Sequence, residues 1–383
     1  MRRNPRERMD ALVADAHLRW SLAGIRGLGR AGLRVVALGP RTTSPGLWSR
    51  FAEAREVGPD SVADARGFAS AVGRVAAEYG PLVVYAGNEE AIDALLDGPA
   101  TPPEVLLPYP GAGPTQRLRD KSALPELAAE AGLQTPMTYA RATVAELRIE
   151  SPPAPCVVKP VRPSAALDHA RVIDSDPGLR SLLAELPASE LLLVQERAAG
   201  PLIGLALVMD REGVVAARFQ QVAHRTWPPS AGGSSLAVSI APDEDLVSKA
   251  ARMLSAAGYW GLAHIQFLTT SRGHALIDVN PRFYGSLPLA LAAGVNLPAA
   301  WHAVALGQSP VRPRPYRTGV SYRWMEGEIT AAFRGRRREL LHRVPTPRTG
   351  AMWAPDDRLA SAMLAAGAAS AKVIRRLPRR RGS

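Results

Sequence analysis

The sequence is poor in cysteine, lysine and aromatic residues, and it has no long hydrophobic run. Its one cysteine, Cys156, excludes an internal disulfide and fits a reducing compartment. Because Cys156 stands beside Val157 and Val158 in an apolar segment, we interpret it as a buried structural thiol and not as a nucleophile. No apolar stretch reaches the ~20 residues that cross a membrane, and the N-terminal residues show no secretion-signal pattern. We therefore expect a cytoplasmic protein.

The length of 383 residues and a hydrophobic content of 46% predict a globular protein of two or three packed units. Over the first ~110 residues, apolar strands alternate with helical segments, which predicts a doubly wound parallel sheet. Asn88 is expected to cap the last helix of this region. The expected strands cover residues 11–14, 33–38, 82–85 and 105–108, and the expected helices cover residues 21–30, 61–79 and 88–96.

The chain has no Walker A sequence, but one glycine pattern has the letters of the dinucleotide-binding fingerprint. In Gly27-x-Gly29-x-x-Gly32 the glycines end an expected helix and precede an expected strand. The fingerprint requires the order strand, turn and then helix. We therefore do not expect NAD to bind at these glycines.

The net charge of +12 is concentrated in the C-terminal part of the chain. Residues 311–383 hold 17 Lys and Arg against 5 Asp and Glu, whereas the residues before them are balanced. Arginine clusters at 334–338 and 375–381 are typical of segments that attract acidic lipids, nucleic acids or acidic partners. Because interleaved aromatics and a recognition motif are lacking, we expect no specific nucleic acid partner.

The last part of this basic region is compatible with a helix over residues 357–377, with acids at its start and bases at its end. Our hypothesis is a weak, reversible contact of residues 357–383 with an acidic membrane surface, peripheral at the inner membrane. A solvated, disordered tail is the alternative, and the sequence leaves both open.

The stretch Gly273–Ser286 carries the most chemistry in the chain. Residues 275–279 form an expected buried strand, so Asp278 and Asn280, two residues apart, lie on one face. A carboxylate and an amide side by side suit an oxygen-preferring cation such as Mg2+, and Gln266 on the preceding expected strand offers a third oxygen. Arg282 presents a fork of donors for a phosphate or carboxylate. A β-hairpin with polar strand ends is the simpler alternative.

Lysine is rare in this arginine-rich chain, and the four that occur are Lys121, Lys159, Lys249 and Lys372. A position where such a chain has lysine and not arginine is a candidate for a phosphate contact, because the lysine ammonium group is compact. Lys121 precedes an alanine-rich expected helix, and Lys159 ends the expected strand 155–160.

Taken together, the Asp-x-Asn-Pro-Arg stretch and the two lysines resemble the ATP-grasp superfamily. The closest group is the carbamoyl-phosphate-synthetase-like carboxylate–amine ligases. The resemblance covers residues ~115–307, with its motifs in the family's order. It implies that Lys121 and Lys159 contact the phosphates of ATP, and that Gln195, Glu196 and Ala198 form the hinge that binds adenine.

The resemblance also implies the remaining site residues and the cofactors. Gln266, Asp278 and Asn280 would bind one or two Mg2+ ions, for which Mn2+ can substitute. Arg282 would act on the transferred phosphoryl group, and Arg225 would orient a substrate carboxylate near Gly232 and Gly233. The sequence departs from the family at two places. At the metal site, Gln266 and Asp278 stand where the family commonly has glutamate, and glutamine at the first position resembles the carbamoyl-phosphate-synthetase branch. The loop at residues 161–168 lacks glycine.

The fold implied is α/β and α+β. A pre-ATP-grasp α/β domain with a doubly wound parallel sheet (residues 1–112) precedes a two-lobed ATP-grasp domain (residues 113–310) and a basic C-terminal extension (residues 311–383) with a helix. The activity implied is ATP-dependent joining of a small-molecule carboxylate to an amine, through an acyl phosphate. A catalytically impaired ATP-binding or scaffold protein is the alternative, because of the two departures from the family pattern.

Overall fold

A computed structural model describes most of the chain. The described residues are 8–98, 102–147, 154–162, 164, 166–167, 169–228, 232–308, 313–325, 327–328, 348–350 and 353–374. The chain divides into two compact units: Met1–Pro108 with Trp324–Glu326 and Thr349–Ser383, and Tyr109–Arg323 with Gly327–Arg348. The arginine clusters at 334–338 and 375–381 lie outside the described residues.

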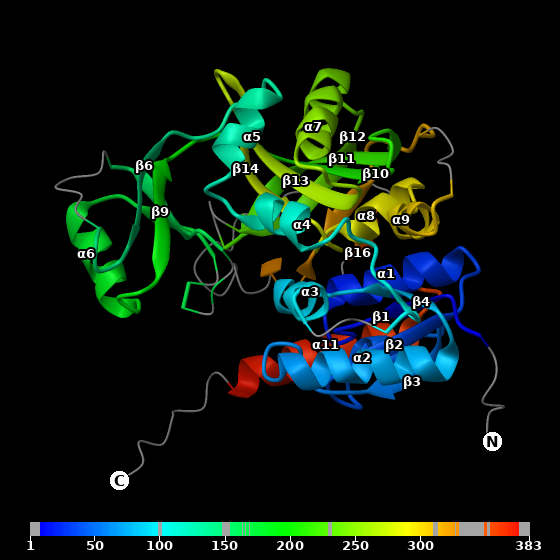
Figure 1. Ribbon diagram of the computed structural model, residues 1–383. Coiled ribbons are helices and arrows are strands. Elements are labelled where there is room, and N and C mark those ends of the chain that lie inside the picture. The colour runs from blue at the N-terminus through cyan, green and yellow to red at the C-terminus, as the bar shows by residue number, and fades with distance from the viewer. Residues whose placement is uncertain are drawn as a thin grey trace, which may run out of the picture. The chain divides into compact units, whose positions relative to one another are not determined.

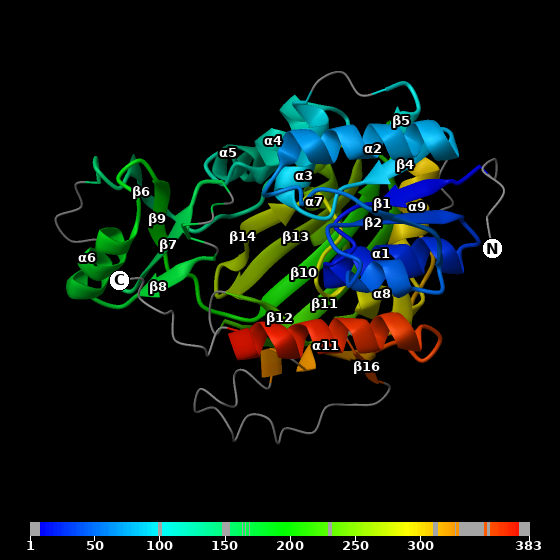
Figure 2. The ribbon, with the colours of Figure 1, turned by 90° about the horizontal axis from the view of Figure 1, so that it is seen from below.

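The first unit contains a parallel sheet with the strand order β3-β2-β1-β4-β5. Figures 1 and 2 show this sheet between helix α1 on one side and α2 on the other, which confirms the predicted doubly wound sheet. The sequence analysis did not predict β3, an edge strand in which charged residues alternate with alanines. The strands are β1 (Ala11–Val13), β2 (Val35–Gly39), β3 (Ala52–Val57), β4 (Leu82–Tyr85) and β5 (Val105–Leu106).

Side-chain caps begin two helices of this unit, and the glycine pattern lies at the end of a third. Asp64 accepts a hydrogen bond from the amide of Gly67, and Asn88 accepts one from Ala91, as predicted for Asn88. Gly27 and Gly29 lie inside α1, ahead of β2, so the dinucleotide fingerprint is absent here. The helices are α1 (Arg19–Arg30), the short 3-10 helix η1 (Pro45–Trp48), α2 (Ala65–Tyr79) and α3 (Glu89–Leu96).

The C-terminal helix α11 (Arg358–Ile374) belongs to the same unit and contacts η1. Asp357, 2% exposed, anchors it. Its carboxylate accepts hydrogen bonds from Arg26 Nε at 2.8 Å, from the Ser49 hydroxyl at 2.8 Å and from the Arg50 amide at 2.9 Å. Ser361, one helical turn later, accepts from Arg26 Nη2. The structure gives no support to membrane contact by this segment, because its first turns are packed within the unit.

The second unit includes a small lobe built on an antiparallel sheet with the order β6-β9-β7-β8. Helix α6 (Asp176–Glu185) packs on it, and Cys156 is fully buried in its core, as predicted for a structural thiol. Burial raises the pKa of this thiol. The strands are β6 (Thr138–Thr143), β7 (Cys156–Pro160), β8 (Arg171–Ile173) and β9 (Leu191–Glu196).

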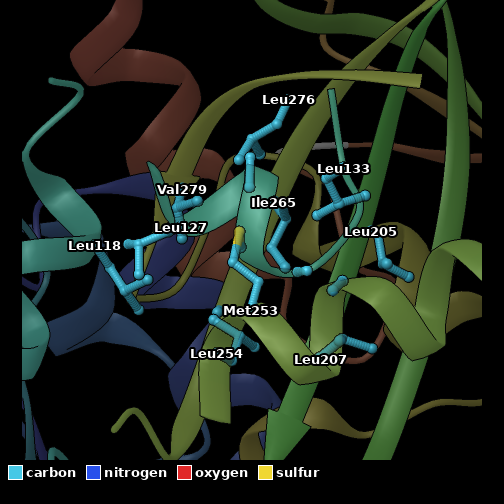
Figure 3. Close-up of a cluster of buried hydrophobic side chains, with 14 of the residues drawn as sticks. Leu118, Leu127, Leu133, Leu205, Leu207, Met253, Leu254, Ile265, Leu276 and Val279 are labelled. Atoms are coloured by element: carbon cyan, nitrogen blue, oxygen red, sulfur yellow. The ribbon is translucent and has the colours of Figure 1, made fainter. Parts of the chain in front are cut away.

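A larger antiparallel sheet with the order β14-β13-β10-β11-β12-β15 completes the second unit. Its strands alternate between two faces. One face packs on α4, α5 and α7 through residues such as Leu205, Leu207 and Ile265, which meet Met253 and Leu254 of α7 (Figure 3). Strands β10 and β13 also contact α9. The strands are β10 (Leu202–Met209), β11 (Val215–Trp227), β12 (Gly233–Ile240), β13 (Gly261–Thr270), β14 (Gly273–Asn280) and β15 (Ser321–Arg323).

The helices of the second unit are α4 (Ala112–Arg119), α5 (Leu124–Glu130), α6, α7 (Glu244–Ala256), α8 (Leu287–Ala293) and α9 (Leu297–Ala305). A last short strand, β16 (Arg348–Gly350), falls at the boundary of the two units in sequence. None of the described helices is by itself long and apolar enough to span a membrane. Only α8 and α9 taken as a pair reach that threshold, and they are bent by 98°.

The anchoring of α11 is testable by removing Asp357. Asp357→Ala leaves the buried Arg26 guanidinium without its carboxylate, which we expect to destabilise the first unit by ~3–5 kcal/mol. The matched control is Asp356→Ala, which breaks the neighbouring but exposed pair with Arg30 and should cost ~0–1 kcal/mol. Urea denaturation followed by circular dichroism measures both. Equal, small shifts for the two variants would contradict a central role for Asp357.

Candidate active site

Polar side chains on β13 and β14 lie on the same face of the larger sheet. The ladder pairs Gln266 with Asp278 and His264 with Asn280, and directly opposed residues project to one side. The alternate residues Ile265 and Val279 project into the core on the other side (Figure 3). The side chains of Asp278 and Asn280 meet, with Asn280 Nδ2 donating to Asp278 Oδ2 at 2.9 Å.

A β-bulge interrupts the ladder immediately beyond the Gln266–Asp278 pair. Gln266 is opposite Asp278, and the next residue, Phe267, is opposite Leu276, so Ile277 has no ladder partner. Its carbonyl accepts a hydrogen bond from Lys159 Nζ at 3.0 Å. Lys159 comes from β7 of the small lobe, so the bulge gives that lobe a contact with the larger sheet at the polar cluster.

Lys121 completes a cluster of charges around Asp278. Its Nζ lies 3.3 Å from Asp278 Oδ1, and the two side chains are 18% and 25% exposed. The backbone amide of Lys121 donates to the carbonyl of Val161, just beyond β7. Lys121, Lys159 and Asp278 thus meet from three segments far apart in the sequence.

The environment shifts the pKa values in this cluster. Burial lowers the pKa of Lys159 to about 8, an effect that the Asp278 carboxylate partly offsets and Lys121 reinforces. For Asp278, burial alone would raise the pKa. The attraction of Lys121 and Lys159 and the hydrogen bond from Asn280 outweigh it, so the pKa of Asp278 is lowered. The carboxylate is therefore ionised at neutral pH.

Arg282 extends the polar chain beyond Asn280. Its Nη2 donates to Asn280 Oδ1 at 3.2 Å and its Nη1 donates to the carbonyl of Phe283 at 3.1 Å. Both ends of the Asn280 amide are therefore bonded, one to an acid and one to a base. This chain of bonds orders Asp278 and Asn280 at the end of β14 and Arg282 just beyond it.

The oxygen atoms of Asp278, Asn280 and Gln266 fit a hard cation such as Mg2+, which prefers carboxylate and amide ligands. Among the described residues, no group of three or more His, Cys, Asp or Glu side chains is placed to hold a metal. The cluster therefore offers a single carboxylate. Such a set suits an ion that takes most of its other ligands from phosphate oxygens and water.

The end of β9 is held by side chains that the sequence analysis placed at the adenine hinge. Glu196 accepts from Arg272 Nη2 at 2.8 and 2.9 Å, and its Oε2 also accepts from the Met137 amide. The Met137 amide and then Arg272 lower the pKa of Glu196. Gln195 donates to the Thr138 hydroxyl. The Ala198 amide donates to the carbonyl of Glu196, which closes a turn after the strand.

Arg225 lies on β11 and forms an ion pair with Glu328, with Nη2 and Oε2 at 2.8 Å. The Glu328 side chain is 1% exposed, and its other oxygen accepts from the Ser235 hydroxyl at 2.8 Å. The sequence analysis considered Arg225 as a carboxylate-binding arginine and did not identify Glu328. Because Glu328 is far from Arg225 in the sequence, no local sequence pattern indicates that the two side chains pair.

In the loop after β7, Ser164 donates to Glu190, and residues 163, 165 and 168 lie outside the described residues.

A family model described as "ATP-grasp in the biosynthetic pathway with Ter operon" matches residues 211–328. No curated protein matches the chain in sequence.

Several solved structures have a similar fold. Biotin carboxylase from Campylobacter jejuni, in an ATP complex, has a TM-score of 0.62 at 15% identity, covering 82% of this chain and 74% of that one. The biotin carboxylase domain of Hydrogenobacter thermophilus 2-oxoglutarate carboxylase, with MgADP and bicarbonate, has a TM-score of 0.58 at 15% identity and covers 80% and 71%. L-amino acid ligase from Bacillus licheniformis has a TM-score of 0.57 at 19% identity and covers 81% and 76%. These similarities confirm the predicted ATP-grasp fold.

The charge cluster predicts a distinctive titration for Lys159. Because the chain has only four lysines, isotope labelling of lysine gives few signals to assign by NMR. We expect Lys159 to titrate with a pKa near 8, well below the ordinary value of a lysine. In Asp278→Asn the pKa of Lys159 should fall further, because the carboxylate raises it. An ordinary lysine pKa at Lys159, or a Lys159 pKa that is unchanged in the variant, would contradict this arrangement.

Proposed function

We propose that this chain, which has the ATP-grasp fold, is a ligase that activates a carboxylate as an acyl phosphate and joins it to an amine, releasing ADP and phosphate. The observation that carries the proposal is the meeting of Lys121, Lys159 and Asp278 at the bulge of β14. Two lysines and one carboxylate suit a triphosphate with its cation better than they suit an uncharged substrate.

Each part of the site has a role in this proposal. Lys121, Lys159 and Arg282 offset charge on the phosphates of ATP. Backbone groups at the end of β9, around Gln195, Glu196 and Ala198, bind the adenine. Complexes with ATP and MgADP among the similar structures support ATP and magnesium as cofactors.

The residues proposed to hold one or two Mg2+ ions, or Mn2+ in their place, are Asp278, Asn280 and Gln266. When bound, the ion offsets negative charge on the terminal phosphates. Asn280 hydrogen-bonds to both Asp278 and Arg282 in the structure, so the Asp278 and Asn280 side chains are ordered before the ion binds.

The reaction moves the γ-phosphoryl group of ATP to an oxygen of the substrate carboxylate, which leaves ADP. The amine nitrogen then forms a bond to the acyl carbon, the carbon–oxygen bond to phosphate breaks, and a proton leaves the nitrogen. Arg225, oriented by Glu328, is the proposed contact for the substrate carboxylate. No side chain acts as a nucleophile in this scheme, and the buried Cys156 is consistent with that.

For the domains, we propose that residues 1–112 form the pre-ATP-grasp domain and residues 113–310 the ATP-grasp domain, with residues 311–383 as an extension. The helix α11 of this extension packs within the first unit through Asp357. The partners proposed are a small-molecule carboxylate and an amine, and the L-amino acid ligase among the similar structures supports that substrate class.

The proposal is tested by measuring ADP release with ATP and Mg2+ against pools of amino acids, hydroxy acids and sugar acids, each with a pool of amines. We expect ADP release that requires the metal and rises only when the right acid is present. ATP binding without turnover across all pools would favour the impaired ATP-binding protein, which is the alternative raised by Asp278 and by the glycine-free loop.

The metal assignment predicts the effect of Asp278→Asn. This substitution keeps the size of the side chain and removes the single carboxylate of the cluster, so ADP formation should fall by at least ~100-fold. Asp245→Asn on α7 is the control, because that acid contacts only the surface Lys249 among the described residues. Thermal melting checks that both variants fold. Turnover in Asp278→Asn with an ordinary Mg2+ dependence would refute the assignment.

The two lysines at the site predict a difference in ATP affinity. Lys159→Ala removes a buried ammonium from the phosphate position and should weaken ATP binding by ~10–100-fold, from the ~1.5–3 kcal/mol of a hydrogen bond to a charged group. Lys249→Ala on the surface of α7 should leave the dissociation constant unchanged. Calorimetric titration with ATP and Mg2+ compares the two, and equal effects would show that Lys159 does not contact the nucleotide.

A further inference from the structure

Three polar side chains on the site face of the larger sheet are buried with an atom that lacks a partner. His264, Gln221 and Tyr284 are 6%, 2% and 3% exposed. His264 Nε2, Gln221 Oε1 and the Tyr284 hydroxyl have no hydrogen-bond partner among the described residues. Buried polar groups are nearly always bonded, and each unmade bond costs ~1–3 kcal/mol. Three such atoms in one region indicate a ligand-binding site.

Two of these side chains converge over Gly204. Gly204 lies on β10, opposite Gln221 on β11 and opposite Gln266 on β13. A Cβ atom at Gly204 would lie 2.8 Å from His264 Nε2 and 3.3 Å from Gln221 Nε2. The absence of a side chain at Gly204 therefore allows the imidazole and the amide to approach the same point.

The neighbouring contacts fix the direction of these groups. Gln221 Nε2 donates to the Ser286 hydroxyl at 2.8 Å and to the Ser234 hydroxyl at 3.3 Å, which leaves Oε1 as the acceptor. The His264 ring stacks on the Tyr284 ring with centroids 4.0 Å apart and planes within 5°. This stacking orders both rings.

The set is next to the residues proposed for phosphoryl transfer. His264 is opposite Asn280 in the ladder, and Gly204 is opposite Gln266, which is itself opposite Asp278. Opposed residues share a face, so these groups and the proposed metal ligands lie on one side of the sheet. The adenine hinge, at the end of β9, is on the other lobe. A ligand at Gly204 is therefore positioned as a reacting substrate and not as the base of the nucleotide.

The side chains of His264, Gln221 and Tyr284, which form this set, favour the binding of an uncharged group. The set consists of an imidazole, an amide and a phenol, with no carboxylate, lysine or arginine among its three members. A charged group placed there would lose its hydration without gaining a counterion in direct contact. The set offers one acceptor, one hydroxyl donor and one imidazole nitrogen that serves as either, depending on its tautomer. A small group that both donates and accepts, such as an amine or a hydroxyl, satisfies it.

We propose that His264 and Gln221, which converge over Gly204, together with Tyr284, which stacks on His264, bind the acceptor amine of the second substrate in its unprotonated form. This inference rests on the proposed ligase function and names the site of its amine. An amine must be unprotonated to attack an acyl phosphate. Burial among three uncharged side chains disfavours the ammonium form, and the nearest charged groups, Asp278 and Arg282, are of opposite sign. Gln221 Oε1 accepts from the amine, and the three side chains hold it on the face that carries Asp278 and Asn280.

The test uses the full chain, with NMR of nitrogen-15-labelled histidine and no nucleotide. Hydroxylamine is the uncharged amine probe, methylammonium the cationic probe and formate the anionic probe. The chain has seven histidines, and the signal of His264 is identified by its loss in His264→Gln. We expect hydroxylamine to shift the His264 Nε2 signal saturably, and the two ions to shift it much less.

Gly204→Ala provides the matched perturbation, because it adds one methyl group at the point where His264 and Gln221 meet. It should weaken hydroxylamine binding at least tenfold. Gly113→Ala, whose Cβ would have nothing within 4 Å, should leave binding unchanged. If Gly204→Ala does not fold, Gln221→Met removes the acceptor at similar volume and should give the same loss.

The inference is overturned if hydroxylamine produces no saturable shift, if formate or methylammonium shifts the signal equally, or if Gly204→Ala binds as the parent does. Because this measurement needs no turnover, it separates the subsite from the ligase reaction. Once an acid–amine pair gives ADP release, Gly204→Ala should raise the KM of the amine at least tenfold and leave that of ATP unchanged. An equal rise in both would instead assign Gly204 a structural role.

Discussion

The attraction between one carboxylate and two lysines organises the candidate active site. Asp278 keeps its charge in a partly buried position because Lys121 and Lys159 stand beside it and Asn280 donates to it. Removing charges from water is costly, and such a cluster persists when opposite charges and hydrogen bonds compensate. The cost is also what makes the cluster useful. In the proposed function, two ammonium groups held near a carboxylate would meet the phosphates and cation of a nucleotide without further ordering.

The same region links the small lobe to the larger sheet. Lys159 reaches from β7 to the carbonyl of Ile277 on β14, and Arg272, in the turn between β13 and β14, reaches Glu196 at the end of β9. The first contact depends on a bulge that leaves Ile277 out of the ladder. The second is an exposed pair, which contributes little to stability. Each contact involves one residue proposed to bind the nucleotide, Lys159 in the first and Glu196 in the second, so we expect nucleotide binding and the arrangement of the two lobes to be coupled.

Periodic patterns made much of the fold predictable from the sequence. The parallel sheet follows from alternating strands and helices, and the shared face of Asp278 and Asn280 follows from their spacing of two. The strand β3 was missed because its residues alternate between alanine and charge, which lacks the apolar run of a buried strand. The bulge at Ile277 and the pairs Arg225–Glu328 and Arg26–Asp357 were also missed. The two pairs depend on which distant segments meet, and the bulge depends on the register between β13 and β14. A single sequence carries no local signal of either.

The central claim is that a substrate carboxylate becomes an acyl phosphate, and an isotope measurement tests it most directly. The acid that supports ADP release is supplied with oxygen-18 in its carboxylate, and the phosphate released is analysed by mass spectrometry. In the proposed reaction the carboxylate oxygen that accepts the phosphoryl group leaves with it. The account therefore predicts one oxygen-18 atom in each phosphate released. Phosphate without the label would show that ATP is cleaved by water and would contradict carboxylate activation.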